Sequence, residues 1–249
     1  MSDDLEALYP FLYADTSDLT TVLDQVRAST VAKAAEIGEL RRAVAARDGA
    51  RIEACAREMA ARFAAGGRLF AFGNGGSATD AAQLATLFLA PIAGAGGGGG
   101  AGPAGGGGPA AGGAGLEAPG WEPPPLPAFG LANDTSVVTA LCNDVGVDVV
   151  FARQLAAFGS RDDIAVGLST SGNSDNLLRA FDEASRRGML TVGLAGYDGG
   201  RMAELDSIDY LFVVPSSSVH RIQEAQTTIY QVLWELTAEE MSHVPRHTR

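Results

Sequence analysis

A hydroxyl-rich turn stands between an apolar run and a helical segment in the middle of the chain. The run is 164–168, the helical segment is 175–181, and the turn between them reads Ser169-Thr170-Ser171-Gly172-Asn173-Ser174. A phosphate group needs many hydrogen-bond donors and some positive potential, and this arrangement offers hydroxyls, turn amides and the N-terminus of a helix. In the alternative interpretation, Ser174 only caps the helix and the other hydroxyls decorate a turn. We interpret the segment as a phosphate-binding loop.

A second loop with the same context occurs earlier. Gly73-Asn74-Gly75-Gly76-Ser77 follows the apolar run 68–72 and precedes a helical segment that includes Asp80 and Leu84. Glycines allow a ligand to approach the backbone closely, while Asn74 and Ser77 can donate hydrogen bonds to it. Loops that follow parallel strands meet at the carboxyl edge of the sheet, where open α/β sheets bind ligands. The two loops together therefore predict one ligand site.

Groups that could transfer a proton are scarce near these loops. His220 is the only histidine before the C-terminal tail, and Glu224 follows it by four residues. Both are candidates for catalysis, although a histidine at a helix start or an interface is common, and an acid in the first helical turn favours the helix dipole. His243 and His247 lie in a polar tail and are expected to be solvated.

The first third of the chain has helical periodicity. Between 19 and 63 the apolar residues recur mostly at steps of three or four, which is typical of helices. Asp48-Gly49 is predicted to break this stretch into two helices, and Gly66-Gly67 to end the second. We therefore expect an N-terminal helical hairpin within residues 1–66.

Five short apolar runs predict the strands of an α/β fold. They lie near 68–72, 128–131, 164–168, 190–194 and 210–214, and helical or loop segments separate them. Strands that alternate with helices favour a five-stranded parallel sheet flanked by helices on both faces. A last amphipathic helix is expected at about 219–240, packed on the sheet or on a neighbouring subunit.

The segment 92–125 differs from the rest because it is rich in Gly, Ala and Pro. It has almost no side chains that could bury enough area to offset the entropy of ordering it. We interpret it as a disordered surface insertion rather than a functional lid.

Composition limits the function classes. With 249 residues, 46% of them hydrophobic and 19% charged, the chain can bury one sizeable core, so a single domain over 1–249 is expected. The net charge of −12 argues against direct binding of nucleic acid. Cys55 and Cys142 form no disulfide framework or metal-binding spacing, the start is acidic, and no apolar run approaches a membrane span. We expect a soluble cytoplasmic protein without membrane contact.

Five stretches, taken in order, resemble the successive motifs of the phosphoheptose isomerase family, and the likeness covers nearly the whole chain to about Leu236. They are Phe72-Gly73-Asn74-Gly75-Gly76-Ser77-Ala78-Thr79-Asp80-Ala81, Leu141-Cys142-Asn143-Asp144-Val145-Gly146, Leu168-Ser169-Thr170-Ser171-Gly172-Asn173-Ser174, Gly196-Tyr197-Asp198-Gly199-Gly200 and Arg221-Ile222-Gln223-Glu224-Ala225. The resemblance implies a sugar isomerase (SIS) fold, a homotetramer and binding of sedoheptulose 7-phosphate. It assigns phosphate binding to Ser169, Thr170, Ser171 and Ser174, and further substrate binding to Asn74, Gly75, Gly76, Asn143, Asp144 and Gln223.

The positions that would carry the family's chemistry differ. The family has a His and a Glu four residues apart on the helix after the first glycine loop, where this chain has Gln83 and Leu87. On the last helix it has a Gln and, eight residues later, a His, where this chain has Gln223 and Gln231. An amide cannot titrate, so it cannot move the proton of an aldose–ketose isomerisation. We therefore expect no zinc, no other cofactor and no family mechanism.

Three hypotheses follow. The first is a SIS-domain protein that binds a phosphorylated sugar without metal-assisted isomerase chemistry. The second is an active isomerase on sedoheptulose 7-phosphate or a related sugar phosphate, with His220 or Glu224 in place of the family pair. The third is a protein-interaction scaffold similar to the DnaA-initiator-associating protein, a relative with the same fold.

Overall fold

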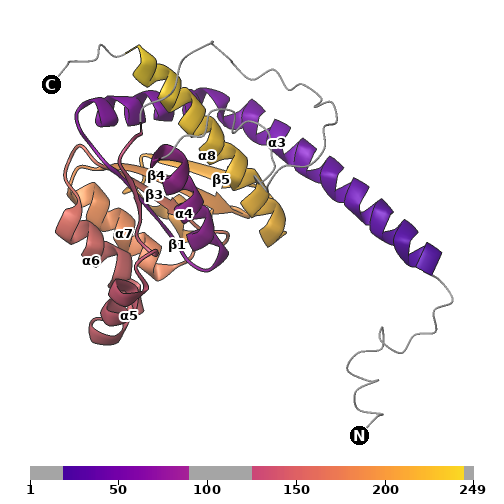
Figure 1. Ribbon diagram of the computed structural model, residues 1–249, viewed down its shortest axis with the longest axis horizontal. Helices are drawn as coiled ribbons and strands as arrows, with labels where there is room; N and C mark the ends of the chain where they lie inside the picture. Colours follow the sequence, from indigo (N-terminus) through magenta and orange to yellow (C-terminus); the bar gives the residue numbers. More distant parts are fainter. Residues whose placement is uncertain (1–18, 90–124, 244–249) are drawn as a thin grey trace, which may run out of the picture.

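A five-stranded parallel sheet with helices on both faces forms the body of the protein. The computed structural model describes residues 19–89 and 125–243 (Figure 1). The strand order is β2-β1-β3-β4-β5, and every neighbouring pair is parallel. The strands are β1 (Leu69–Gly73), β2 (Ala128–Gly130), β3 (Ile164–Leu168), β4 (Leu190–Gly196) and β5 (Tyr210–Val214). The predicted α/β class with a five-stranded parallel sheet is confirmed.

The three central strands are buried along their whole length. Successive side chains of a strand point to opposite faces, so a sheet covered on both sides needs continuous apolar runs. In β1, Leu69 and Ala71 join the core on one face, while Phe70 and Phe72 join the core on the other. The uninterrupted apolar runs seen in the sequence are therefore those of strands buried on both faces.

Different helices cover the two faces (Figure 1). One core includes residues of α3 (Leu19–Ala64), α4 (Gly76–Leu89) and α8 (Val219–Ser242). The other includes residues of α6 (Val150–Phe158), α7 (Asp175–Arg186) and the 3-10 helix η2 (Gly200–Glu204). The short helices α5 (Thr135–Asp144) and η1 (Val147–Val149) precede α6. Because all five strands are parallel, the loops that follow them lie at one edge, the carboxyl edge of the sheet, and these include the two loops predicted to bind the ligand.

The predicted N-terminal hairpin is wrong, because residues 19–64 form one helix of 46 residues. At the expected break, the Asp48 side chain is buried and pairs with Arg47 at 2.5 Å and Arg51 at 3.2 Å. Arg47 also donates a hydrogen bond to the carbonyl oxygen of Val213 in β5. These contacts stabilise helical backbone where the local sequence favours a turn. The helix does end before Gly66, as expected.

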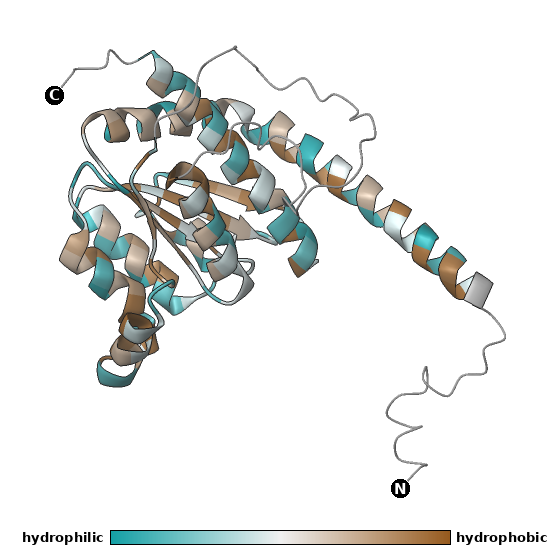
Figure 2. Ribbon diagram, in the orientation of Figure 1, coloured by the Kyte–Doolittle hydropathy of each residue, from teal (hydrophilic) through white to brown (hydrophobic). Residues whose placement is uncertain are grey.

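The first half of α3 extends beyond the sheet and its helices (Figures 1 and 2). At 1.5 Å per residue, the 46-residue helix is about 70 Å long, far longer than the strands that it crosses. Large apolar side chains on the projecting part are exposed to solvent: Val22, Leu23, Val26 and Val31.

Two sequence predictions meet the limits of the described residues. The Gly-, Ala- and Pro-rich insertion at 92–125 lies outside them except for its last residue. No helix among residues 19–89 and 125–243 is long and apolar enough to cross a membrane.

Candidate functional site

The hydroxyl-rich loop lies between β3 and α7, at the carboxyl edge of the sheet. Ser169 is buried; its Oγ accepts a hydrogen bond from the Gly172 amide at 2.9 Å, and its carbonyl oxygen accepts one from Gln226 Nε2 at 3.0 Å. Gln226 is fully buried in α8. Ser169 therefore shapes the loop through both its side chain and its backbone.

Glycine is required at 172 by conformation and by space. Its φ is +68°, and a Cβ there would come within 1.9 Å of the Gly199 carbonyl oxygen. The Gly172 carbonyl accepts a hydrogen bond from the Met202 amide at 3.0 Å, and Asn173 Oδ1 accepts one from the Arg201 amide at 3.0 Å. The loop is thereby held against the turn that follows β4.

The other hydroxyls of the loop are only partly buried. Thr170, Ser171 and Ser174 are all half-buried, and Ser171 Oγ accepts a weak hydrogen bond from the Asn173 amide at 3.3 Å. Ser174 has N-cap backbone geometry at α7, yet its side chain makes no capping hydrogen bond. These hydroxyls thus lie at the positive end of a helix with donor capacity left for a ligand.

A cation that the sequence analysis did not single out also lies beside this loop. Arg201 forms an exposed ion pair with Asp175, the first residue of α7, at 2.5 Å. The guanidinium is therefore at the same helix end as the hydroxyls. Its signal in the sequence was its position directly after Gly199-Gly200, the motif against which the loop packs.

The two predicted loops are joined by a pair of side-chain amides. Asn74 and Asn176 exchange two hydrogen bonds of 2.9 Å, although 102 residues separate them in the chain. Asn74 belongs to the glycine loop after β1, and Asn176 is a buried residue in the first turn of α7. The prediction that the two loops share one edge is confirmed, but Asn176 was missed because a single amide in a helix carries no distinctive pattern.

Gln223 and Asp80 form the next contact along the glycine loop. Gln223 Nε2 donates to Asp80 Oδ2 at 3.0 Å, and a Cβ on Gly76 would come within 2.5 Å of the same nitrogen. Gly76 therefore lets α8 approach the start of α4. Burial raises the pKa of Asp80 above its ordinary value, and the hydrogen bond from Gln223 opposes this shift.

The positions that the sequence resemblance assigns to metal ligands make other contacts here. Gln83 Oε1 accepts a hydrogen bond from the Tyr230 hydroxyl at 3.1 Å, and burial raises the pKa of that hydroxyl, which keeps it a donor. Leu87 packs against the apolar core, and Gln231 is exposed on α8. Among residues 19–89 and 125–243, no three His, Cys, Asp or Glu side chains come together as a metal site would require.

The remaining predicted residues lie farther from the loop contacts. Asn143 donates to Asp144 at 2.8 Å at the exposed end of α5, and in the described chain neither side chain bonds to the two loops. His220 is exposed in the first turn of α8. Glu224 pairs with Arg221, so its carboxylate already has a cationic partner.

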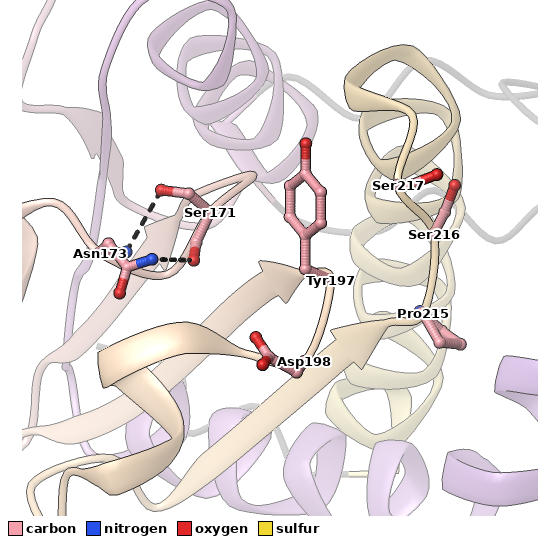
Figure 3. Close-up of a pocket in the computed structure, with 7 residues that line it drawn as sticks. All are labelled: Ser171, Asn173, Tyr197, Asp198, Pro215, Ser216 and Ser217. Carbon is pink, nitrogen blue, oxygen red and sulfur yellow. Dashed lines mark hydrogen bonds between the residues drawn. The ribbon is translucent and has the colours of Figure 1, made fainter.

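A hollow of about 700 Å³ opens beside the phosphate loop (Figure 3). Ser171 and Asn173 line one side of it, and Ser216 and Ser217, from the segment between β5 and α8, line the other. The Tyr197 ring stands between these two sides. The loop therefore borders a space large enough for a small molecule.

Comparison with known proteins gives close relatives. The chain is 40% identical over 185 residues to the phosphoheptose isomerase of Solidesulfovibrio magneticus, which covers 74% of this chain and 76% of that protein. It is 39% identical over 198 residues to the phosphoheptose isomerase of Pelodictyon phaeoclathratiforme, with 80% and 82% covered. No protein-family model matches the chain.

Solved structures of phosphoheptose isomerases also match this chain. The structure of a phosphoheptose isomerase from Francisella tularensis matches with a TM-score of 0.68 and 26% identity, over 88% of this chain and 98% of that one. The phosphoheptose isomerase from Neisseria gonorrhoeae matches with the same TM-score and 29% identity, over 85% and 99%. Since sequence relatives are matched along most of their length and solved structures match over 85% and 88% of this chain, the chain belongs to the phosphoheptose isomerase family.

Proposed function

We propose that this protein binds a phosphorylated sugar, with the phosphate in the loop between β3 and α7. The observation that carries the proposal is the built geometry of this loop. Ser169 and Gln226 hold its backbone, Gly172 locks it onto the next turn, and the capping hydroxyl of Ser174 is left free of a capping bond. A dianionic phosphate would receive hydrogen bonds from Thr170, Ser171 and Ser174 and the favourable dipole of α7.

The sugar would extend from this loop toward the glycine loop after β1. Asn74 is held there by Asn176, and Gln223 by Asp80, so polar groups are already oriented at that end. Gly75 and Gly76 would let the ligand approach the backbone, and Asn143 and Asp144 would complete the site as the family resemblance implies. The pre-set amide contacts lower the entropic cost of binding.

We also propose that binding here proceeds without the family's zinc. Zinc sites in proteins use imidazole, thiolate and carboxylate ligands, whereas the corresponding positions hold Gln83, Leu87, Gln223 and Gln231. Gln83 Oε1 already accepts a hydrogen bond from the Tyr230 hydroxyl, and Leu87 packs against the core. This donor set does not fit zinc.

An active isomerase is the second candidate, and the relatives favour it. Proteins 39% and 40% identical to this chain are named phosphoheptose isomerases. Moving a proton between adjacent carbons needs a base near the sugar. His220 and Glu224 remain candidates; Asp80 joins them because it is buried beside the glycine loop and burial raises its pKa.

Calorimetric titration with sedoheptulose 7-phosphate tests binding. We expect saturable binding to the wild type and a roughly tenfold or larger loss in Ser171→Ala, since a hydrogen bond to a charged group is worth about 1.5–3 kcal/mol. Ser185→Ala, an exposed hydroxyl near the other end of α7, is the matched control and should bind as the wild type does. No binding by the wild type, or equal affinity of Ser171→Ala and wild type, would refute the phosphate assignment.

NMR of the same mixture of protein and sedoheptulose 7-phosphate in deuterium oxide distinguishes binding alone from isomerase activity. Binding without an aldose product or deuterium incorporation supports the first proposal. Turnover supports the second, and the variants His220→Ala, Glu224→Gln and Asp80→Asn then identify the base. The experiment is run with and without added zinc, because turnover only with zinc would contradict our reading of the metal positions.

We further propose that the protein is a cytoplasmic homotetramer that does not bind nucleic acid directly. The two cysteines are both free, which suits a reducing compartment. The net charge of −12 disfavours nucleic acid. Exposed apolar residues on the projecting half of α3 supply surface that a second copy would cover.

A further inference from the structure

The hollow beside the phosphate loop includes residues that the proposed sugar-phosphate site does not use. Tyr197 and Asp198 follow β4, and Ser216 and Ser217 follow β5. All of them lie on the side of the phosphate loop formed by β4 and β5, whereas the glycine loop lies on the β1 side. The hollow is thus a space beside the phosphate loop that the part of the ligand adjoining the phosphate can fill before the rest of the sugar reaches the glycine loop.

Tyr197 adopts a conformation that packing alone does not explain. Its φ is +53°, and among residues 19–89 and 125–243 no other residue except glycines has a positive φ. This backbone region is unfavourable for a bulky side chain, and such strain concentrates at functional sites. Tyr197 is also 42% exposed, so burial of its ring gives little compensation. An exposed aromatic ring held in a strained turn indicates a ligand contact.

The groups around the ring define what kind of ligand part fits. The hollow is lined by one carboxylate, one amide, several hydroxyls and Pro215, with no cation among them. A second phosphate would therefore face Asp198 without a counter-charge. An uncharged polyol fits: the aromatic face covers its C–H groups while hydroxyl and carboxylate oxygens bond its hydroxyls.

Asp198 has capacity for such a bond. Its Oδ1 accepts a hydrogen bond from the Gly200 amide at 3.1 Å, which orients the carboxylate. Within the described residues, Oδ2 accepts no hydrogen bond, and the Ser217 hydroxyl has no partner either. Both groups line the hollow and are exposed.

The Tyr197 turn is held in fixed register with the phosphate loop. Gly172 contacts the backbone of Gly199, and the Met202 amide donates to the Gly172 carbonyl. Ser171 and Asn173 belong to both the phosphate loop and the hollow. The Tyr197 ring therefore keeps a fixed position beside the phosphate loop (Figure 3).

From this geometry we infer that Tyr197 and Asp198 form a specificity subsite that binds an uncharged, hydroxyl-bearing part of the phosphosugar, with the tyrosine ring packed on its C–H face. This inference rests on the proposed phosphate site. It predicts that the protein distinguishes sugar phosphates by the polyol next to the phosphate, through residues outside the glycine loop.

Calorimetry with two probes tests the subsite: sedoheptulose 7-phosphate, which carries a polyol, and inorganic phosphate, which does not. Tyr197→Gly removes the ring and suits the positive φ, so it should fold. We expect it to lower the affinity for the sugar phosphate about three- to tenfold, the range for an aromatic packing contact. The affinity for inorganic phosphate should stay unchanged. Tyr197→Asn, which also tolerates this conformation, should give the same loss, and Tyr197→Phe should bind as the wild type does.

Phe158→Ala is the matched control, because it also removes an exposed aromatic ring, at the end of α6. It should leave the affinity for both probes unchanged. Equal affinity of wild type and Tyr197→Gly for the sugar phosphate would overturn the subsite while the phosphate site stands, as would an equal loss for both probes. If the wild type binds neither probe, the proposed function itself fails and the subsite with it.

Discussion

At the scale of single residues, the pKa values of two buried aspartates are shifted in opposite directions. Asp163 is 1% exposed and Asp80 is 9% exposed. Burial alone would raise the pKa of Asp163, but hydrogen bonds from Arg68 and Ser160 outweigh it and lower that pKa. Asp80 receives one hydrogen bond, from Gln223, and there burial prevails and raises the pKa. Relative to the unfolded state, folding therefore favours the charged form of Asp163 and the protonated form of Asp80.

Replacing Asp80 by Asn should become more favourable to stability as pH rises. Because the folded pKa of Asp80 is above the ordinary value of 3.8, the folded state binds this proton more tightly than the unfolded state. The wild type consequently loses stability as pH rises from 3.8 through the folded pKa. We expect the free energy of unfolding of Asp80→Asn, relative to wild type, to increase over that window and then level off, as measured by urea unfolding at several pH values.

Asp163→Asn is the control, for which the pH dependence of the stability change should have the opposite sign. Its folded pKa lies below 3.8, so the carboxylate stabilises the fold fully above that pH and loses this effect as pH falls below it. The variant should be less stable than wild type by about 2 kcal/mol at neutral pH, since hydrogen bonds to a charged group are lost, and the deficit should shrink in acid. The same pH trend in both variants would contradict this account of the two sites.

At the scale of elements, α3 is continuous because tertiary contacts outweigh a local turn signal. Arg47 reaches the carbonyl oxygen of Val213 in β5 from the helix that passes over the sheet, and the ion pairs of Asp48 with Arg47 and Arg51 support the same helical stretch locally. Gly49 then lies in a helix interior, where its backbone freedom costs stability without serving a turn.

Gly49→Ala should therefore stabilise the protein by about 1 kcal/mol, the difference in helix propensity between the two residues. A Cβ at this position meets nothing within 4 Å, so no clash offsets the gain. Gly67→Ala is the contrasting variant, because its Cβ would come within 1.9 Å of the Asp162 carbonyl oxygen. Denaturant midpoints should move up for Gly49→Ala and down for Gly67→Ala; a lower midpoint for Gly49→Ala would favour the hairpin after all.

At the scale of the whole molecule, the described chain leaves an apolar helix segment uncovered. Val22, Leu23, Val26 and Val31 on the projecting part of α3 are each more than half exposed, at 53%, 58%, 57% and 64%. Removing apolar side chains from water is favourable by about 25 cal/mol for each Å² of apolar surface. Association that covers this segment would therefore stabilise the protein.

We expect the wild type to sediment as a tetramer and the double variant Val26→Glu, Val31→Glu to sediment as a smaller species that keeps its helical circular dichroism. Val137→Glu, at an exposed position on α5, should leave the assembly intact. If the wild type is monomeric, the uncovered helix favours instead the interaction-scaffold hypothesis, in which another protein covers it.

The sequence alone determined the elements whose signals are local. The bounds of β3 agree with the predicted run 164–168, because a strand buried on both faces must be apolar throughout and ends where polar residues begin. The bounds of the edge strand β5 agree with the predicted run 210–214, which Pro215 ends. The end of α3 before Gly66 and the position of the hydroxyl-rich loop before α7 follow from equally local preferences. The motif order likewise indicated the family.

Only the tertiary structure decided features that depend on residues distant in the chain. The helix passes through Asp48-Gly49 because β5 supplies a partner 166 residues away. The amide pair of Asn74 and Asn176 spans 102 residues, and the strained conformation of Tyr197 lies in a motif whose letters show nothing unusual. In each case the free energy of a contact between distant segments outweighs or adds to the local preference, and a pattern read along the chain does not contain that free energy.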